Sequence, residues 1–120
     1  MRYTISEMAS LLGVTTHTLR YYEKMGLIRP EVNEETGYRY YTVTDTRRFN
    51  LCRELRAAEL SLEECRELIG SPSVEQSDEM FARQAARLRR RQVLDELSIR
   101  FLEKMQEQYR TLEQDVGRVW

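Results

Sequence analysis

The sequence is poor in the residues on which enzymes, metal proteins and secreted proteins most often depend. Its 120 residues include two cysteines, one histidine, two prolines and five glycines. Cys52 and Cys65 lie in apolar helical patterns, which predicts reduced core thiols rather than a disulfide or a pair of metal ligands. The sequence has one histidine and neither a pair of inward carboxylates nor a glycine loop that could bind phosphate. It therefore shows no set of residues typical of an active site. We therefore predict a protein without enzymatic activity, metal site or cofactor.

Long hydrophobic runs and an excess of one charge are also missing. No apolar run approaches the ~20 residues of a membrane span, and the N-terminus lacks the basic-then-apolar pattern of a signal peptide. The composition, 41% hydrophobic and 32% charged, predicts a soluble chain whose default compartment is the cytoplasm. Residues 1–60 hold nine Lys and Arg against eight Asp and Glu, so bulk charge neither supports nor excludes nucleic-acid binding.

A capped helix and a glycine turn open the chain. The segment Thr4–Glu7 has the sequence of a capping box, in which the threonine hydroxyl accepts from the Glu7 amide. Spacings of three and four residues place four apolar side chains on one helical face: Ile5, Met8, Ala9 and Leu12. Gly13 supplies the positive φ of a tight turn, and Thr15 is a suitable N-cap for the next helix. These features predict two short helices joined at Gly13.

The second helix has two faces of different chemistry. Its inward face is apolar and consists of Val14, Leu19 and Tyr22. Its outward face carries hydroxyls, an imidazole, a guanidinium and a phenol, on Thr16, His17, Arg20 and Tyr21. The spacing of the two helices is typical of a helix-turn-helix, whose second helix reads the major groove of DNA. The alternative is an ordinary antiparallel helix pair.

A short β-hairpin is predicted after the second helix. The signal consists of an extended run, a turn and a run of strand-forming residues: Leu27–Pro30, Asn33–Gly37 and Tyr38–Val43. Arg39 lies between aromatic residues and suits insertion along a phosphate backbone or a narrow minor groove. Tyr40 and Tyr41 point to opposite faces, so one of them is predicted to be a core residue. The hairpin would form the wing of a winged helix-turn-helix.

Two further helices are predicted to form a second helical pair. Thr44 is a possible cap for the third helix, whose inward side chains are Phe49, Cys52 and Leu55. The segment Ser61–Glu64 is a second capping box. The fourth helix that follows it buries Leu62, Cys65, Leu68 and Ile69 and ends at Gly70.

The last third of the chain has the composition of one long helix. Proline and glycine are absent from residues 73–116, which predicts a helix near Ser77 to Asp115, about 58 Å long at 1.5 Å per residue. Apolar residues recur along it as a stripe: Phe81, Ala85, Leu88, Leu94, Leu97, Phe101, Met105, Tyr109, Leu112 and Val116. A domain this small cannot cover the stripe, so a partner helix is predicted. The run Arg89–Arg91 interrupts the heptad register, which predicts a stutter in the coiled coil. The three arginines are expected to face solvent or carboxylates of the partner, and the alternative is contact with DNA.

The order of these features resembles the MerR family of bacterial transcription regulators. Its most specific motifs are the LRYY run of Leu19–Tyr22 and the GYRYY run of Gly37–Tyr41, and the wing is most similar to the multidrug-responsive branch. The resemblance implies a mainly α fold: a winged helix-turn-helix, a second helical pair, and a long helix that pairs antiparallel in a homodimer. It also implies that the dimer bends and untwists a pseudo-palindromic promoter, so that RNA polymerase engages both promoter elements.

The resemblance also assigns roles to residues by position. His17 and Tyr21 would face base edges, whereas Arg20 and Tyr22 would approach phosphates. The expected DNA contacts together are Thr4, Thr15, Thr16, His17, Arg20, Tyr21, Tyr22, Tyr38, Arg39, Arg56 and Leu62. The expected dimer contacts are Leu94, Leu97, Phe101, Met105, Tyr109, Leu112 and Val116.

The same features predict four regions. We expect a DNA-binding domain at residues 1–70, a linker at 71–76, a dimerisation helix at 77–116 and a tail at 117–120. Many relatives continue into a ligand-binding domain at this point. That domain is either cut off here or not part of a short family member, so the sequence does not identify the effector.

Two positions depart from the family pattern. Relatives often have Lys or Arg where this chain has His17, and Gly where it has Glu59; a left-handed backbone at Glu59 would cost about 1 kcal/mol more than with glycine.

Three other functions compete with that of a MerR regulator. Two of them are an excisionase-like architectural DNA-binding protein and a coiled-coil protein-interaction module. A thiolate metal sensor is disfavoured because no cysteine follows Cys65.

Overall fold

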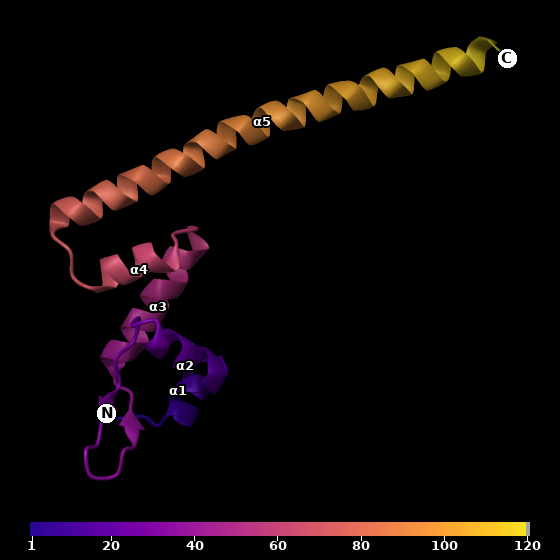
Figure 1. The fold of residues 1–120 in the computed structure, drawn as a ribbon. Helices are drawn as coiled ribbons and strands as arrows, with labels where there is room; N and C mark the ends of the chain where they lie inside the picture. Colours follow the sequence, from indigo (N-terminus) through magenta and orange to yellow (C-terminus); the bar gives the residue numbers. More distant parts are fainter. Residues whose placement is uncertain (120) are drawn as a thin grey trace. The chain divides into compact units, whose positions relative to one another are not determined.

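The fold is mainly helical, with one small hairpin between the second and third helices (Figure 1). The computed structural model describes residues 1–119, and for residues 117–119 it describes the backbone alone. The elements in chain order are α1 (Ile5–Leu12), α2 (Thr16–Lys24), β1 (Glu31–Val32), β2 (Arg39–Tyr40), α3 (Val43–Ala57), α4 (Leu62–Ile69) and α5 (Val74–Val119). The chain forms two compact units: Met1–Ser77, which we call the head, and the part from Asp78 onward. The predicted fold class is confirmed.

Helices α1 and α2 form at the predicted caps and turn. Thr4 Oγ1 accepts from the Glu7 amide at 3.2 Å, and Thr15 Oγ1 accepts from the Thr18 amide at 3.1 Å. Gly13 has a φ of +69°, the left-handed conformation that ends α1 and lets the chain reverse. The inward faces of both helices then meet in the first core cluster, which consists of Met8, Ala9, Leu19, Ile28, Tyr41 and Phe49.

A second core cluster joins the end of α2 to α3 and α4. It consists of Leu27, Cys52, Leu55, Leu60 and Cys65. Cys52 and Cys65 are both free and fully buried, as predicted, and the two thiols interact with each other. Burial, followed by the neighbouring Cys65 thiol, raises the pKa of Cys52 to about 11. Both groups therefore act as small apolar side chains at neutral pH.

The turn between α3 and α4 contains a strained residue. Glu59 has a φ of +66°, a conformation that residues with a Cβ adopt at a cost. The Glu59 amide donates to the Arg56 carbonyl at 2.9 Å, and the Leu60 amide donates to the Leu55 carbonyl at 3.1 Å. These bonds close the turn and direct Leu60 into the second core cluster. The backbone at Glu59 is therefore left-handed, the case in which glutamate costs about 1 kcal/mol more than glycine.

The wing exists, but its first strand lies later than predicted. Strands β1 and β2 are antiparallel, with Glu31 opposite Tyr40 and Val32 opposite Arg39. The run predicted to be extended, Leu27–Pro30, is not part of the sheet, because its two aliphatic side chains enter the core and proline has no amide to donate. The turn between the strands is built as predicted: Asn33 Oδ1 accepts from two amides that follow it in the chain.

The wing is also tied to the N-terminus of the chain. Tyr3 and Tyr41 pair as an isolated antiparallel bridge, with amide-to-carbonyl distances of 2.8 and 2.7 Å. The Tyr41 side chain is fully buried, while Tyr40 remains half-buried, so the prediction that one of them is a core residue is confirmed. No feature of the sequence near Tyr3 indicates this bridge.

Helix α3 begins earlier than predicted because its cap lies upstream of Thr44. The residue preceding the helix is Thr42, and the Asp45 carboxylate accepts from the Thr42 amide at 3.0 Å. Asp45 is buried and also accepts from the Arg29 amide at 3.2 Å. One carboxylate thus caps α3 and fixes the chain that leads into the wing.

Helix α5 also begins earlier than predicted. Ser73 Oγ accepts from the Gln76 amide, and Gln76 Oε1 accepts from the Ser73 amide, both at 3.1 Å. This reciprocal cap starts the helix at Val74 instead of Ser77, so the non-helical part of the expected linker, residues 71–76, is limited to 71–73.

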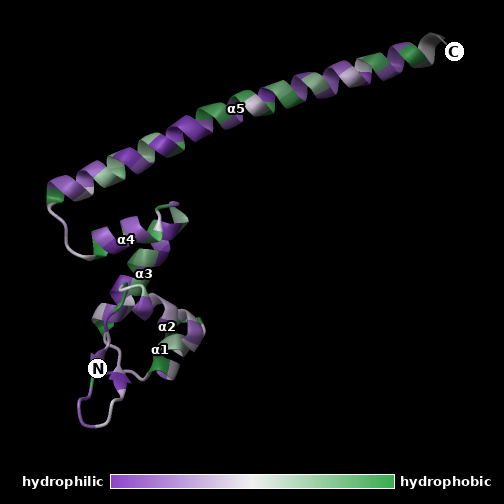
Figure 2. Ribbon diagram, viewed as in Figure 1, coloured by the Kyte–Doolittle hydropathy of each residue, from purple (hydrophilic) through white to green (hydrophobic). Residues whose placement is uncertain are grey.

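Beyond its cap, α5 is one continuous helix. It has 46 residues and is about 69 Å long at 1.5 Å per residue. It includes residues 117–119 of the expected tail, whereas Trp120 lies outside the described residues. Hydrophobic bands recur along it between hydrophilic ones (Figure 2). No helix of the described residues is long and apolar enough to cross a membrane.

The predicted apolar stripe is exposed along the second half of α5. The exposed fractions are 56% for Leu94 and Leu97, 60% for Phe101, 65% for Tyr109, 58% for Leu112 and 51% for Val116. Met105 is half-buried. The positions expected to contact a partner therefore lie on the surface of the single chain.

Candidate nucleic-acid interface

The outward face of α2 is presented to solvent as the sequence predicts. His17, Arg20 and Tyr21 are exposed, and Thr16 is half-buried beside them. Leu19 on the opposite face is fully buried in the first core cluster and fixes the rotation of the helix. Because the helix is held by its other face, the exposed side chains are free to contact a groove.

A cleft between α1, α2 and the wing brings four predicted DNA contacts together. We call it the wing cleft; its lining includes Thr4, Arg20, Gly37, Tyr38, Arg39 and Tyr40, and its volume is about 590 Å³. Thr4 marks the N-terminus of α1, where amide groups without helical partners point outward. Helix N-termini and guanidinium groups both favour phosphate, so the cleft suits a nucleic-acid backbone.

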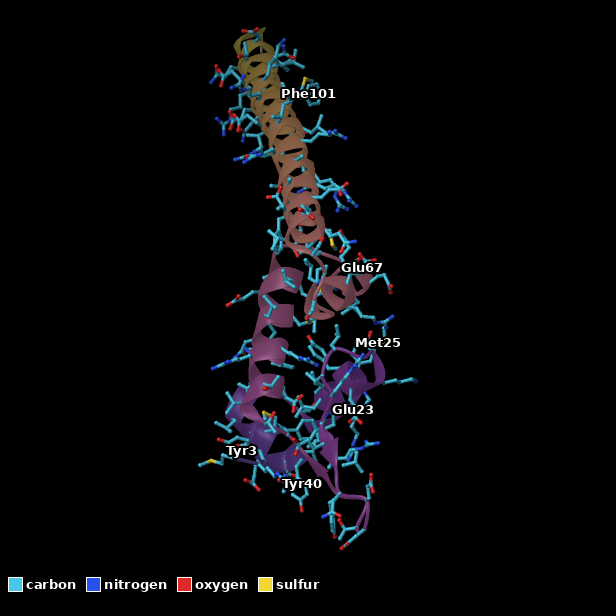
Figure 3. All side chains as sticks on the ribbon, turned by 90° about the vertical axis from the view of Figure 1, so that its left-hand side faces the viewer. Tyr3, Glu23, Met25, Tyr40, Glu67 and Phe101 are labelled. Carbon is cyan, nitrogen blue, oxygen red and sulfur yellow. The ribbon has the colours of Figure 1, made fainter. Side chains whose placement is uncertain are left out.

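The wing side of this cleft is held in place by a residue whose role the sequence does not reveal. Glu23 on α2 binds Arg39 at 3.2 Å and accepts from the Tyr41 hydroxyl at 3.3 Å. Figure 3 labels Glu23 beside the hairpin that carries Tyr40. Burial, followed by the charge of Glu23, raises the pKa of Tyr41 to about 12. Glu23 therefore positions Arg39, and it lies 16 residues away, beyond the reach of any local pattern.

Tyr22 is directed mainly into the head. Its ring centroid lies 4.8 Å from that of Phe49, and burial raises the pKa of its hydroxyl. The hydroxyl also interacts with the Cys52 thiol in the second core cluster. The predicted inward orientation of Tyr22 is confirmed, whereas its contact with phosphate stays a prediction.

Two expected DNA contacts lie outside the wing cleft, at the turn between α3 and α4. Arg56 donates to the Leu60 carbonyl at 2.8 Å, so it stabilises this turn in addition to any contact with DNA. Leu62 is the first residue of α4, after the capping residue Ser61, which accepts from the Glu64 amide at 3.1 Å. The N-terminal amides of α4 thus form a second place on the head that favours an anion.

The interface offers positive charge and hydrogen-bond donors rather than reactive groups. Within residues 1–119, no cluster of three or more His, Cys, Asp or Glu side chains is placed to hold a metal ion. Arg53 is exposed on α3, and its guanidinium donates to the Leu12 carbonyl at 3.1 Å and lies 5.2 Å from the centre of the Phe49 ring. The hydrogen bond fastens α3 to α1.

Comparison with known proteins decides the family. The model of the MerR HTH family of regulatory proteins matches residues 3–71, more than half of the chain. The chain belongs to the MerR family. The matched MerR segment contains α1 to α4 and the wing, and thus every expected DNA contact. MerR proteins are regulators and not enzymes, in agreement with the prediction of no catalytic activity.

Two relatives and one solved structure show how far the similarity extends. ZntR of Escherichia coli K12 is 43% identical over 67 residues, which cover 56% of this chain and 48% of ZntR. YyaN of Bacillus subtilis, an uncharacterised HTH-type regulator, is 32% identical over 118 residues, covering 96% and 83%. HiNmlR, a MerR family regulator that lacks the sensor domain, was solved bound to promoter DNA. It aligns with a TM-score of 0.61 and 26% identity over 87% of this chain and 92% of that one. The match thus spans about half of ZntR but most of YyaN.

Proposed function

We propose that the chain is a cytoplasmic DNA-binding transcription regulator that acts as a homodimer on a pseudo-palindromic promoter. The observation that carries the proposal is the wing cleft, which places the N-terminus of α1 and the wing residue Arg39 beside Arg20 on the exposed face of α2. Phosphate contacts position a protein on DNA, and base contacts give specificity. HiNmlR, which is similar to this chain and was solved bound to promoter DNA, supports a DNA-binding function.

The residues divide into anchors and readers. We assign Thr4, Arg20, Tyr38 and Arg39 to the phosphates that enter the wing cleft, with Arg56 and the α4 amides at Leu62 holding a second stretch of backbone. Base edges are assigned to the exposed side chains of α2, principally His17 and Tyr21, with Thr15 and Thr16 at its start. The phosphate contact of Tyr22 belongs to the same proposal.

The dimer is proposed from α5. Its exposed stripe repeats at spacings of three and four residues, the period of a helix-to-helix seam. An antiparallel second copy presents the same stripe in reverse, so one surface covers the other, and two heads are held a fixed distance apart. Such a dimer has the means to bend and untwist the DNA between its half-sites, which would bring promoter elements into register for RNA polymerase.

Selection of bound duplexes from a random pool tests the proposal. Two half-sites in inverted orientation at a fixed spacing are the expected result, because the symmetry of the protein is copied in its site. A single half-site bound by a protein that stays monomeric at micromolar concentration would favour the excisionase-like alternative. Failure to enrich any duplex, with the dimer intact, would favour a protein-interaction module.

Fluorescence anisotropy over a range of salt concentrations then separates anchors from readers. Arg20→Ala is expected to weaken all duplexes alike and to lower the salt slope by about one counterion. His17→Ala is expected to change the preferred base at one position, at about 1–3 kcal/mol for a lost specific contact. Arg47→Ala, on an exposed α3 residue outside the interface, is the matched control for loss of one positive charge. A salt slope that is the same for Arg20→Ala and the unmodified protein would remove Arg20 from the anchors.

A further inference from the structure

We propose that the head contains a second anion site, separate from the DNA interface, that binds a phosphoryl group of a small molecule. The site is a pocket lined by the guanidinium-bearing side chains of Arg29, Arg48 and Arg66, together with Gly26, Gly70 and Ser71. We call it the three-arginine pocket. The inference goes beyond transcription regulation and does not depend on it.

Three separate segments converge on the pocket. Arg29 belongs to the loop after α2, Arg48 to the middle of α3, and Arg66 to the second half of α4. The Arg29 backbone is fixed by its amide, which donates to the buried Asp45 carboxylate at 3.2 Å. Arg66 is fixed by its Nε, which donates to the Met25 carbonyl at 2.8 Å. Figure 3 labels Met25 at the end of α2 and Glu67 on α4, the two elements that this bond joins.

The charge of the pocket is only partly compensated, by Glu63 beside Arg66 and by the carbonyl ends of α2 and α4. Arg66 is 3.3 Å from Glu63, its neighbour on α4, but no carboxylate lines the pocket itself. Across residues 1–119, neither the Arg29 nor the Arg48 guanidinium has an ion pair or hydrogen bond. Bringing like charges to one cavity costs free energy, and an anion bound between them removes that cost. An oxyanion is therefore the ligand that this arrangement stabilises.

The size and geometry of the pocket select the class of anion. Its volume is about 260 Å³. Drug-sized ligands usually occupy pockets of about 300–1,000 Å³, so this pocket suits a smaller group. Guanidinium groups bind carboxylate and phosphate through paired hydrogen bonds. Donors from three segments match the several oxygens of a tetrahedral dianion better than the two oxygens of a planar carboxylate.

The pocket lies at the opposite helix ends from the DNA interface. The interface uses the N-termini of α1, α2 and α4, at Thr4, Thr15 and Ser61. The pocket instead uses the C-terminal ends of α2 and α4, at Gly26 and Gly70. The nine residues of α2 alone separate its two ends by about 13 Å at 1.5 Å per residue. The same phosphate therefore cannot occupy both sites.

Isothermal titration of inorganic phosphate into the full chain tests the site, with ionic strength held constant by chloride. One saturable site per chain is expected. Arg48→Gln, and independently Arg29→Gln, should weaken binding at least about tenfold, because each removes a charge-assisted hydrogen bond. Arg48→Lys should bind with intermediate affinity, since it keeps the charge but not the fork of donors. Arg47→Gln, on the neighbouring exposed residue, is the matched control and should bind within about twofold of the unmodified protein.

The outcomes separate the occupants. Tighter binding of glycerol 3-phosphate than of inorganic phosphate would identify a phosphate ester as the source, and equal binding would identify the free ion. Succinate binding as tightly as phosphate would overturn the choice of a phosphoryl group. The absence of saturation, or equal binding by Arg48→Gln and Arg47→Gln, would overturn the site. Displacement of phosphate by stoichiometric duplex DNA would show that the DNA backbone occupies the pocket, which also contradicts the proposal.

Discussion

The head and α5 place their large apolar side chains in opposite environments. In the head, Leu19 and Phe49 are 0% and 1% exposed, and two core clusters connect every helix. In α5, Phe101 is 60% exposed although the helix is unbroken over 46 residues. The head therefore carries in its own sequence the groups that bury its core. The stripe of α5 has the same kind of residue but needs a surface that the helix does not supply.

The largest effect is expected from a cavity in the head. Phe49→Ala removes a ring that contacts Tyr22 at 4.8 Å between centroids and lies in the first core cluster. Loss of such a buried ring costs about 3–5 kcal/mol, partly from transfer and partly from the cavity. Urea denaturation should show this loss at every protein concentration, because the core is made within one chain. Leu51→Ala, at a residue of α3 that is 42% exposed, is the control and should cost well under half as much.

A charge in the stripe of α5 should give the opposite signature. On the proposed dimer, Phe101→Asp places an unpaired carboxylate in a buried seam, which costs about 3 kcal/mol and weakens association by about a hundredfold. Sedimentation should show monomers at concentrations where the unmodified chain is dimeric. Glu103→Ala changes a neighbouring exposed residue and should leave the dimer intact. A dimer that survives Phe101→Asp would show that the stripe faces something other than a second copy.

Alkaline pH should distinguish the two regions through their tyrosines. The pKa of Tyr41 is raised to about 12, so the folded head favours the neutral phenol, whereas the unfolded chain ionises near pH 10. The stability from this group is complete below pH 10 and is lost as the pH rises to 12, by about 2–3 kcal/mol in total. Urea denaturation at pH 9 and at pH 11.5 should show the decrease. Tyr41→Phe should make the decrease smaller without abolishing it, because burial also raises the pKa values of Tyr22, Cys52 and Cys65, while Tyr109→Phe, in the exposed stripe, should leave it unchanged. Equal pH slopes in all three proteins would contradict the assignment to Tyr41.

Local signals in the sequence predicted the elements, and contacts between distant segments could not be predicted. The caps at Thr4 and Thr15 and the turn at Gly13 each depend on residues within four positions, and all three are confirmed. The misplaced helix starts have the same local nature: Thr42 and Ser73 each cap a helix together with a residue three positions later. Both patterns are present in the sequence, but the predicted helix starts lie downstream of them, at Thr44 and Ser77.

The functional geometry depends mostly on the contacts that no local pattern contains. The Glu23 carboxylate binds Arg39 across 16 residues, and the Arg66 guanidinium binds the Met25 carbonyl across 41. From the sequence, a charged residue on an outward helical face is predicted only to be exposed to solvent. Its partner is decided by how the helices and the wing are packed, which is a property of the whole head.

The smallest effect separates backbone strain from side-chain contacts at Glu59. With a φ of +66°, any residue that has a Cβ is strained there, whereas glycine is not. Glu59→Gly and Glu59→Ala both remove the carboxylate, so its contacts cancel when the two variants are compared. The free energy of unfolding of the glycine variant should exceed that of the alanine variant by about 1 kcal/mol. For a unit the size of the head, this corresponds to a melting temperature about 4–8 °C higher. In a helix interior the order reverses, because glycine there costs about 1 kcal/mol relative to alanine; Glu54→Gly against Glu54→Ala in α3 is therefore the control. The same order at both positions would mean that the turn relaxes when Glu59 is replaced, and that the strain is not held by the core around Leu60.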